Sequence, residues 1–325
     1  MKNICLIDAD STIPNLALMK LAEYYKNDSV ELIKLHIPYY PNRKKIKHEI
    51  DTSDYDKVYC SVIFEGNIDY ITGDEIIYGG TGFDLKTCLP DEIEKLTPDY
   101  SIYPENDISY GFISRGCIRN CSFCKVPKKE GKIRQVSTID DIVRHKKVKF
   151  MDNNFLALPN HLELLQELVD KNIKHQFNQG LDIRLVTEEN SELLSKLNYK
   201  REYIFAFDDV KYEKIIEKKI ELLNWRKPWQ LKFFVYVHPD MPIQDTIYRI
   251  KWLKNRECVP YLMRDIKCFY SERNKFYIDL ATWCNQPRIF KNFEFDEFLE
   301  GRYLGKNRKK RINYSLEIYG RANEN

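Results

Sequence analysis

Three closely spaced cysteines are the residues of this sequence best suited to metal or redox chemistry. Cys117, Cys121 and Cys124 follow the pattern C-x3-C-x2-C in the string RGCIRNCSFC over residues 115–124. Thiolates so close together bind one soft metal centre. Three thiolates hold a cubane iron–sulfur cluster when one iron is left open, and that iron then accepts a further ligand.

A structural zinc ion is the alternative for the same three residues. Zinc sites usually take a fourth Cys or His at short spacing, and the nearest downstream histidine, His145, lies beyond a predicted helix. An odd number of cysteines argues against a disulfide framework. The other six are scattered along the chain, at Cys5, Cys60, Cys88, Cys258, Cys268 and Cys284.

The motif resembles the cluster loop of the radical S-adenosylmethionine (SAM) superfamily. Phe123 before the third cysteine belongs to that signature, and the string SRGCIRNCSFCKVPKKEGKIR over residues 114–134 is similar to loops of methylthiotransferases and cobalamin-domain radical SAM enzymes. The resemblance implies a 4Fe-4S cluster on the three cysteines, SAM on the open iron, and reductive cleavage of SAM to a 5′-deoxyadenosyl radical. It also implies an electron donor such as flavodoxin or ferredoxin. The resemblance is specific over residues 110–134. Over residues 106–267 it is a resemblance of architecture, and before residue 100 it is weak.

The same resemblance places SAM contacts at two strand ends. Family members bind the SAM amino group with a segment, often Gly-Gly-Glu, after the second barrel strand; here that position reads Asp152-Asn153-Asn154, without the glycines. Arg184 after the third strand is the candidate partner of the SAM carboxylate. An ion pair of Arg184 with Asp182 or Glu188 is the alternative.

Strands and helices must alternate to position these residues. Six alternations follow residue 107, and they predict parallel strands with right-handed crossovers and an active site at the carboxyl ends. Polar groups follow the last three strands at Asp208-Asp209, His238 and Met263-Arg264-Asp265. The predicted strands are Ser109–Ser114, Val148–Phe155, His175–Ile183, Tyr203–Phe207, Leu231–Val237 and Val259–Met263.

The predicted fold class is α/β, with three parts. Residues 1–100 form a small doubly wound domain resembling a cobalamin-binding domain, residues 107–275 a partial (βα)6 radical SAM barrel, and residues 276–325 a C-terminal extension with a basic tail. The cobalamin motif Asp-x-His-x-x-Gly is missing around His36 and His48, so we expect no cobalamin. The glycines of residues 79–82 allow either a turn or a close approach to a ligand.

Composition leaves the substrate open. The formal net charge is only +3, and neither a membrane span nor a signal peptide is evident, so we expect a cytoplasmic protein. The basic run KNRKKR over residues 306–311 is either a solvated end or a docking arm for phosphates. Cys284 beside Trp283 is either a hydrogen-atom donor or a small buried hydrophobe. A nucleic acid, a small molecule and a peptide are all candidate substrates, and a non-catalytic zinc-binding adaptor is the alternative to an enzyme.

Overall fold

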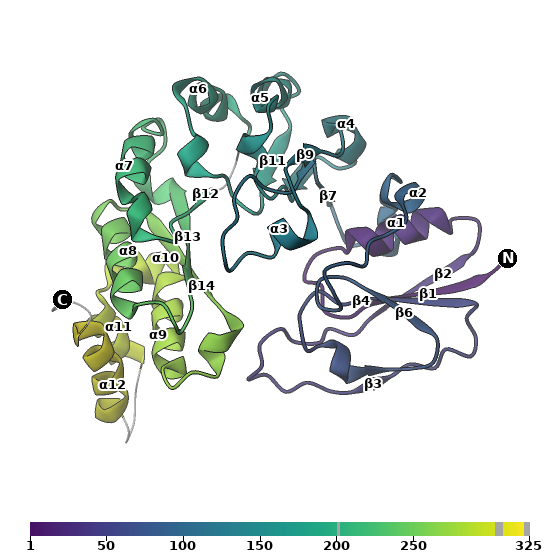
Figure 1. The fold of residues 1–325 in the computed structure, drawn as a ribbon, viewed down its shortest axis with the longest axis horizontal. Helices are drawn as coiled ribbons and strands as arrows, with labels where there is room; N and C mark the ends of the chain where they lie inside the picture. Colours follow the sequence, from purple (N-terminus) through teal and green to yellow (C-terminus); the bar gives the residue numbers. More distant parts are fainter. Residues whose placement is uncertain (200–201, 303–307, 322–325) are drawn as a thin grey trace. The chain divides into compact units, whose positions relative to one another are not determined.

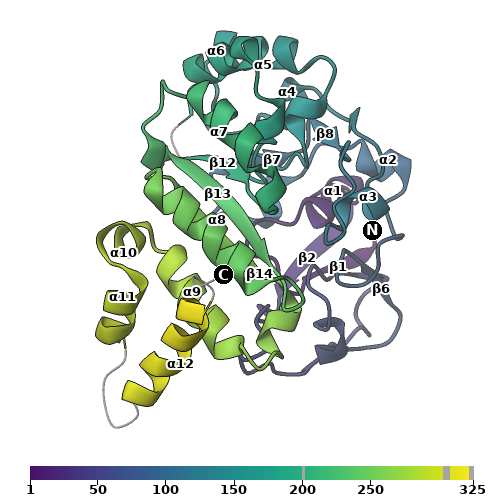
Figure 2. The same ribbon diagram turned by 60° about the vertical axis from the view of Figure 1, so that its left-hand side comes forward.

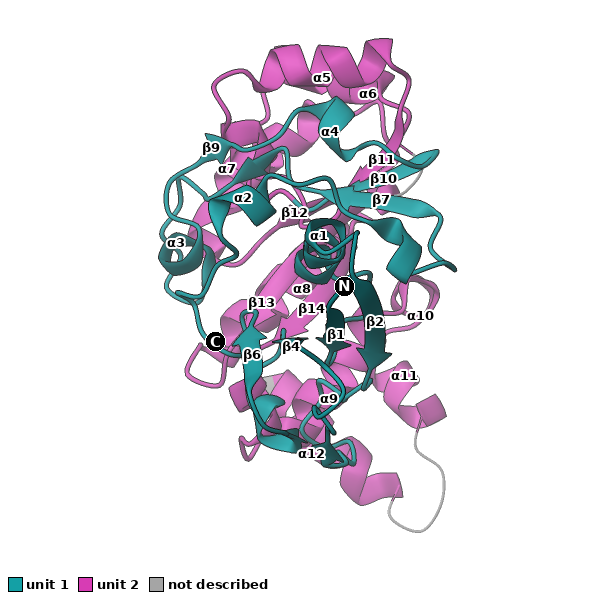
Figure 3. Ribbon diagram, turned by 90° about the vertical axis from the view of Figure 1, so that its right-hand side faces the viewer, with its two compact units in different colours: residues 1–151 teal, residues 152–325 magenta. Residues whose placement is uncertain are grey.

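The computed structural model describes residues 1–199, 202–302 and 308–321, and it is a mixed α/β structure with parallel sheets (Figures 1 and 2). The predicted α/β class is therefore confirmed. The chain divides into two compact units, residues 1–151 and 152–325 (Figure 3). Across the described ranges, every helix is too short or too polar to span a bilayer.

The first unit begins with a four-stranded parallel sheet in the order β2-β1-β4-β6. Alternate residues of β1 face opposite sides, so Ile4 and Leu6 pack with the helix α1 while Cys5 and Ile7 pack with the other face. The elements of this region are β1 (Asn3–Asp8), α1 (Leu16–Tyr24), β2 (Ser29–Lys34), β3 (His48–Glu49), β4 (Lys57–Ser61), β5 (Ile71–Thr72), β6 (Ile76–Gly79) and α2 (Asp91–Glu94).

The glycines that follow β6 serve backbone packing. A Cβ on Gly80 would lie 2.2 Å from the carbonyl oxygen of Val62, and one on Gly82 would lie 2.6 Å from that of Phe64. The φ of Gly80 is +94°, a value that L side chains rarely adopt. The glycine run therefore lets the chain pass close to the segment after β4.

The rest of the first unit carries the cysteine motif. β7 (Ile108–Gly111) pairs in parallel with β10 (Lys147–Phe150), and β8 (Ser114–Arg115) pairs antiparallel with β9 (Arg134–Gln135). The short helices α3 (Val126–Lys129) and α4 (Ile139–Ile142) lie between them in sequence.

The second unit contains the parallel sheet β12-β13-β14, formed by Tyr203–Ala206, Leu231–Val237 and Val259–Arg264. Residues of β13 alternate between buried and half-buried, so one face of the strand is packed under α8 and the other is partly open. Four helices and one strand complete the alternation: α5 (His161–Asp170), β11 (Lys174–Phe177), α6 (Glu188–Lys196), α7 (Glu213–Glu221) and α8 (Ile243–Asn255). All six strands predicted after residue 107 are thus present.

The C-terminal part is helical. Four helices cover most of the region predicted as a C-terminal extension with a basic tail: α9 (Asn274–Cys284), α10 (Pro287–Asn292), α11 (Phe295–Arg302) and α12 (Arg308–Arg321). The buried aromatic side chains of Trp283, Phe290 and Phe295 pack together and form a core within this group of helices. Arg308–Arg311 of the basic run form the first turn of α12, while Lys306 and Asn307 lie outside the described residues.

Candidate functional site

The three cysteines lie on a loop whose two ends are joined. β8 and β9 pair at its base, with Ser114 opposite Gln135 and Arg115 opposite Arg134. The backbone N–H of Cys117 donates to the carbonyl oxygen of Gly131 at 3.2 Å. Residues 116–133 therefore form a closed excursion, which we call the cysteine loop.

A glycine is required where the cysteine loop begins. Gly116 has φ +87°, and a Cβ there would lie 2.3 Å from the carbonyl oxygen of Lys132 and 2.7 Å from that of Gly131. Backbone atoms cannot yield as a flexible side chain would. Only glycine therefore lets the chain enter the loop beside the segment that leaves it.

Backbone hydrogen bonds organise the loop around its sulfur atoms. The N–H of Arg119 donates to Sγ of Cys117 at 3.3 Å, and the N–H of Cys124 donates to the carbonyl oxygen of Cys121 at 3.0 Å. Hydrogen bonds to sulfur stabilise the negative charge that a thiolate carries when it binds a metal. The donor set and the N–H on Cys117 thus fit an iron–sulfur cluster, and they fit a zinc ion equally.

Solvent access separates the loop cysteines from most of the others. Cys117, Cys121 and Cys124 are half-buried, whereas five cysteines elsewhere are buried and Cys88 is exposed. Burial raises the pKa of the Cys60 thiol to about 12 and that of Cys5 to about 11, so both stay protonated and inert. Cys284 is fully buried and its pKa is also raised by burial, which favours a packing role over hydrogen-atom donation.

Within the described part of the chain, no group of three or more His, Cys, Asp and Glu side chains is arranged so that it could hold a metal ion. Metal binding is coupled to folding, so a metal can draw its ligands together when it binds. The assignment of the three cysteines therefore depends on their chemistry and their position in the fold.

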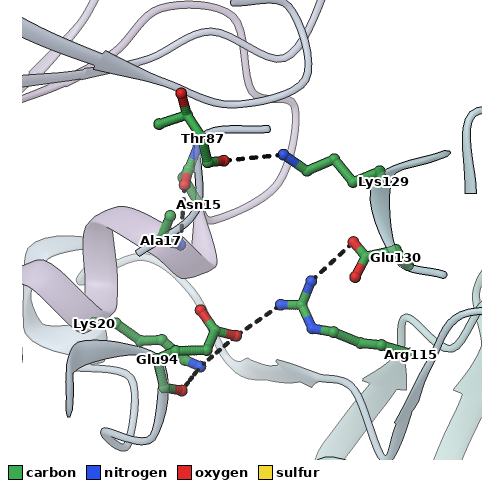
Figure 4. Close-up of polar contacts among 8 residues, drawn as sticks. All are labelled: Asn15, Ala17, Lys20, Thr87, Glu94, Arg115, Lys129 and Glu130. Carbon is green, nitrogen blue, oxygen red and sulfur yellow. Dashed lines mark hydrogen bonds and ion pairs between the residues drawn. The ribbon is translucent and has the colours of Figure 1, made fainter. Parts of the chain in front are cut away.

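Charged side chains clamp the cysteine loop within the first unit (Figure 4). Arg115 lies 2.9 Å from Glu94 and 3.0 Å from Glu130, and its guanidinium stacks on the ring of Phe112. Lys129 donates to the carbonyl oxygen of Thr87 at 3.2 Å. The end of α3 is thus attached to the segment that contains α2, through Lys129 directly and through Glu130 by way of Arg115. The sequence motif gave no sign of this clamp, because the partners lie 15 and 21 residues from Arg115.

The segment after β10 carries the predicted contacts for the SAM amino group. Met151 continues the pairing, because its N–H donates to the carbonyl oxygen of Gly111 at 2.8 Å. Asp152 and Asn154, both buried, and half-buried Asn153 follow as the first residues of the second unit. Phe123, in contrast, lies exposed on the cysteine loop of the first unit.

Arg184 already has a carboxylate partner. Its Nε lies 2.7 Å from Oδ1 of Asp182 and its Nη2 lies 3.0 Å from Oδ2. The guanidinium also stacks on the ring of Tyr212, 4.4 Å from its centre. The ion pair with Asp182 is one of the two alternatives that the sequence left open. A ligand carboxylate at Arg184 would have to share the remaining N–H groups.

A second polar network forms at the carboxyl ends of β12, β13 and β14. Tyr236 connects it, since its N–H donates to Oδ1 of Asp208 at 2.9 Å and its hydroxyl donates to Oδ2 of Asp265 at 2.8 Å. His238 Nε2 lies 3.9 Å from the other oxygen of Asp265. Burial raises the pKa of Asp208. The structure therefore gathers three residues that the sequence placed at one edge, and it adds Tyr236 to them.

Buried Arg249 on α8 completes this edge. Its guanidinium donates to the carbonyl oxygens of Phe207 at 2.8 Å and Tyr236 at 3.1 Å, so it caps the ends of two strands. The sequence pattern of α8 did not identify it, because a charged residue at a helical position usually faces solvent.

Comparison with known proteins adds no relative. The chain matches no protein-family model, no curated protein and no solved structure.

Proposed function

We propose that this chain is a radical SAM enzyme in which Cys117, Cys121 and Cys124 hold a 4Fe-4S cluster. The observation that carries the proposal is the closed loop with three half-buried cysteines at C-x3-C-x2-C spacing, placed directly after a β-strand. When bound, the cluster would supply an electron that cleaves SAM to a 5′-deoxyadenosyl radical.

The chain's own residues would bind and orient the cofactors. Phe123 would cover the cluster side of the loop, and the side chains of Asp152, Asn153 and Asn154 would receive the SAM amino group. Arg184 would contact the SAM carboxylate through its guanidinium, in competition with its ion pair to Asp182. These roles follow the family resemblance, and the place of Asp152 and Asn154 directly after β10 supports them, because active sites of such folds form at the carboxyl ends of strands.

The proposed architecture is a partial (βα)6 barrel built from β7, β10, β11, β12, β13 and β14. Parallel pairing of β7 with β10 in the first unit, and of β12, β13 and β14 in the second, supports it. Polar residues after β12, β13 and β14 lie at the strand ends where barrel active sites form. A reducing compartment such as the cytoplasm, with flavodoxin or ferredoxin as electron donor, suits nine cysteines and a reducible cluster.

Metal analysis tests the proposal. Anaerobically reconstituted protein should contain about four irons and four sulfides per chain, and it should release 5′-deoxyadenosine from SAM in the presence of a reductant. Cys121→Ala should lose cluster and cleavage together, because two thiolates cannot hold the cubane. Cys88→Ala is the matched control, since this exposed cysteine lies outside the loop and should keep both.

Two results would contradict the enzyme assignment. Zinc without labile sulfide in the purified chain would establish the zinc-binding adaptor instead. Undiminished 5′-deoxyadenosine production by Cys121→Ala would show that the cysteine loop does not hold the reactive cluster.

A further inference from the structure

The helices α9 and α12 of the second unit run parallel, with their N-terminal ends together. Tyr314 donates to the carbonyl oxygen of Glu272 at 2.7 Å, just before α9 begins. Ser315 donates to Asp279 at 2.8 Å, and the ring of Tyr319 lies 6.4 Å from that of Trp283 further along. Contacts thus advance in the same direction along both helices, which lie side by side (Figure 2).

A cationic cavity that is widely open to solvent lies at these joined ends. Its volume is about 420 Å³, and it is lined by Glu272, Lys275, Lys310, Arg311 and Tyr314. Three cations face a single carboxylate in this lining, so the cavity carries a net positive charge. The buried carboxylate of Asp279, nearby on α9, is already bonded to Arg302 and Ser315. A neighbouring cavity of about 370 Å³ shares Glu272 and Tyr314 and adds Arg273 and Glu317.

The first turn of α12 gathers cations at the end of the helix that disfavours them. Arg308, Lys309, Lys310 and Arg311 form the first turn of α12, and that turn contains no acidic residue. A helix N-terminus carries a partial positive charge that disfavours nearby cations. Burial lowers the pKa of Lys275, and the charges of Arg311 and Lys310 add to this shift. An anion in the cavity would relieve both repulsions at once.

We propose that the cavity between the N-terminal ends of α9 and α12 binds phosphate groups of a single-stranded nucleic acid. The cations extend beyond the cavity lining to Arg308 and Lys309, both exposed, which is more charge than one phosphate requires. Tyr314 lines the cavity, and Tyr270, which is 75% exposed, lies shortly before α9. Proteins that bind single strands combine cations, which contact the phosphates, with aromatic side chains, on which the bases stack. This proposal goes beyond the radical SAM assignment and does not depend on it.

The test is the salt dependence of binding. Anisotropy of a fluorescent single-stranded RNA should rise on titration with the full-length protein, and log K should fall with log salt by about 0.7 for each phosphate contact. Lys310→Gln/Arg311→Gln removes two cations and should reduce that slope by about 1.4. Lys214→Gln/Lys218→Gln on α7 is the matched control, because both lysines are exposed and the charge change is equal. The single variant Lys310→Glu provides a second measurement, because an exposed acid at a helix N-terminus does not harm folding.

The outcomes separate the possibilities. Weaker binding and a lower slope in both cavity variants, with the control unchanged, support the proposal. Equal slopes in all proteins would overturn the site. Competition by inorganic phosphate or AMP as effective, per mole, as that by unlabelled RNA would show a small phosphate ligand and overturn the nucleic acid. Iron and SAM cleavage measured on the same samples report the proposed function separately, so either can fail alone.

Discussion

A buried histidine makes the stability of the second unit depend on pH. His175 on β11 is almost fully buried between the rings of Phe177 and Tyr199, and its Nδ1 bonds to the carbonyl oxygen of Ile173 at 2.8 Å. Burial lowers its pKa from 6.5 to about 4. The folded chain therefore keeps His175 neutral at pH values where the unfolded chain protonates it.

This difference predicts acid destabilisation. Stability from this residue is fully present above about pH 6.5, and it is lost as the pH falls toward 4, because only the unfolded state gains the proton. The total loss is about 3 kcal/mol. Urea unfolding of the wild type should show it between pH 6.5 and 4.5, and His175→Phe should have a flatter pH dependence. If the stability of His175→Phe followed the wild-type pH curve, the acid destabilisation could not be assigned to His175.

At the scale of residues, the sequence showed which side chains are suited to chemistry better than it showed which residues they contact. The three loop cysteines stand out by type and spacing alone. Arg115 looked like part of the motif, yet its clamp on Glu94 and Glu130 depends on which loops fold back together. Tyr236 gave no signal, because a tyrosine in an alternating strand usually serves packing.

At the scale of elements, hydrophobic periodicity located the strands and their ends only roughly. β13 matches its predicted range of Leu231–Val237, since alternation continues to its last residue. β10 ends at Phe150 rather than Phe155, because the polar residues after it leave the sheet for a 3-10 turn at residues 155–157. α6 begins as its sequence indicates, with a capping box between Thr187 and Asn190.

The helix α8 carries a buried positive charge, Arg249, that donates hydrogen bonds at the ends of β12 and β13. Arg249→Met would leave the carbonyl oxygens of Phe207 and Tyr236 without this donor, and it would remove one of the two arginines whose positive charge acts on Asp208. Breaking such a buried interaction costs about 3 to 5 kcal/mol, so the free energy of unfolding should fall by that amount in urea titrations. Arg256→Met, about two helical turns further on at the C-terminal end of α8, is the control, because its ion pair with Glu217 is partly exposed to solvent. We expect a loss of about 1 kcal/mol there. Equal losses in the two variants would show that Arg249 is not a structural cap.

At the scale of the whole molecule, the sequence predicted the α/β class but not the C-terminal helices. The hydrophobic residues of α9 to α12 form a packed group only when four short segments are assembled, so each segment alone looked irregular. The relevant signal was the density of aromatic residues, Trp283, Phe290, Phe295 and Phe298, of which none is exposed. Such a density predicts a core rather than a solvated extension.

The carboxyl edge of the N-terminal sheet is filled by the chain's own polar groups. The order of the strands along the chain reverses between β1 and β4. Ligands of open α/β sheets bind at such a topological switch point. Asp8 accepts hydrogen bonds from Tyr103 and from the N–H of Ser11. Asp10 accepts from Asn67 and from the N–H groups of residues 63 and 64. These contacts tie Asp8 and Asp10 to the chain itself, and a large cofactor at this edge would compete with them.

This packing predicts that the N-terminal sheet does not bind cobalamin, in agreement with the missing Asp-x-His-x-x-Gly motif. After incubation with hydroxocobalamin and desalting, the protein fraction should lack the visible absorbance of the corrin ring. Asp10→Asn is an informative companion, because it keeps the shape of the side chain while one oxygen becomes a donor facing other donors. It should destabilise the chain by about 1 to 3 kcal/mol without creating cobalamin retention. Stoichiometric retention by the wild type would show that the sheet edge opens for the cofactor, and it would overturn both the prediction and its structural reason.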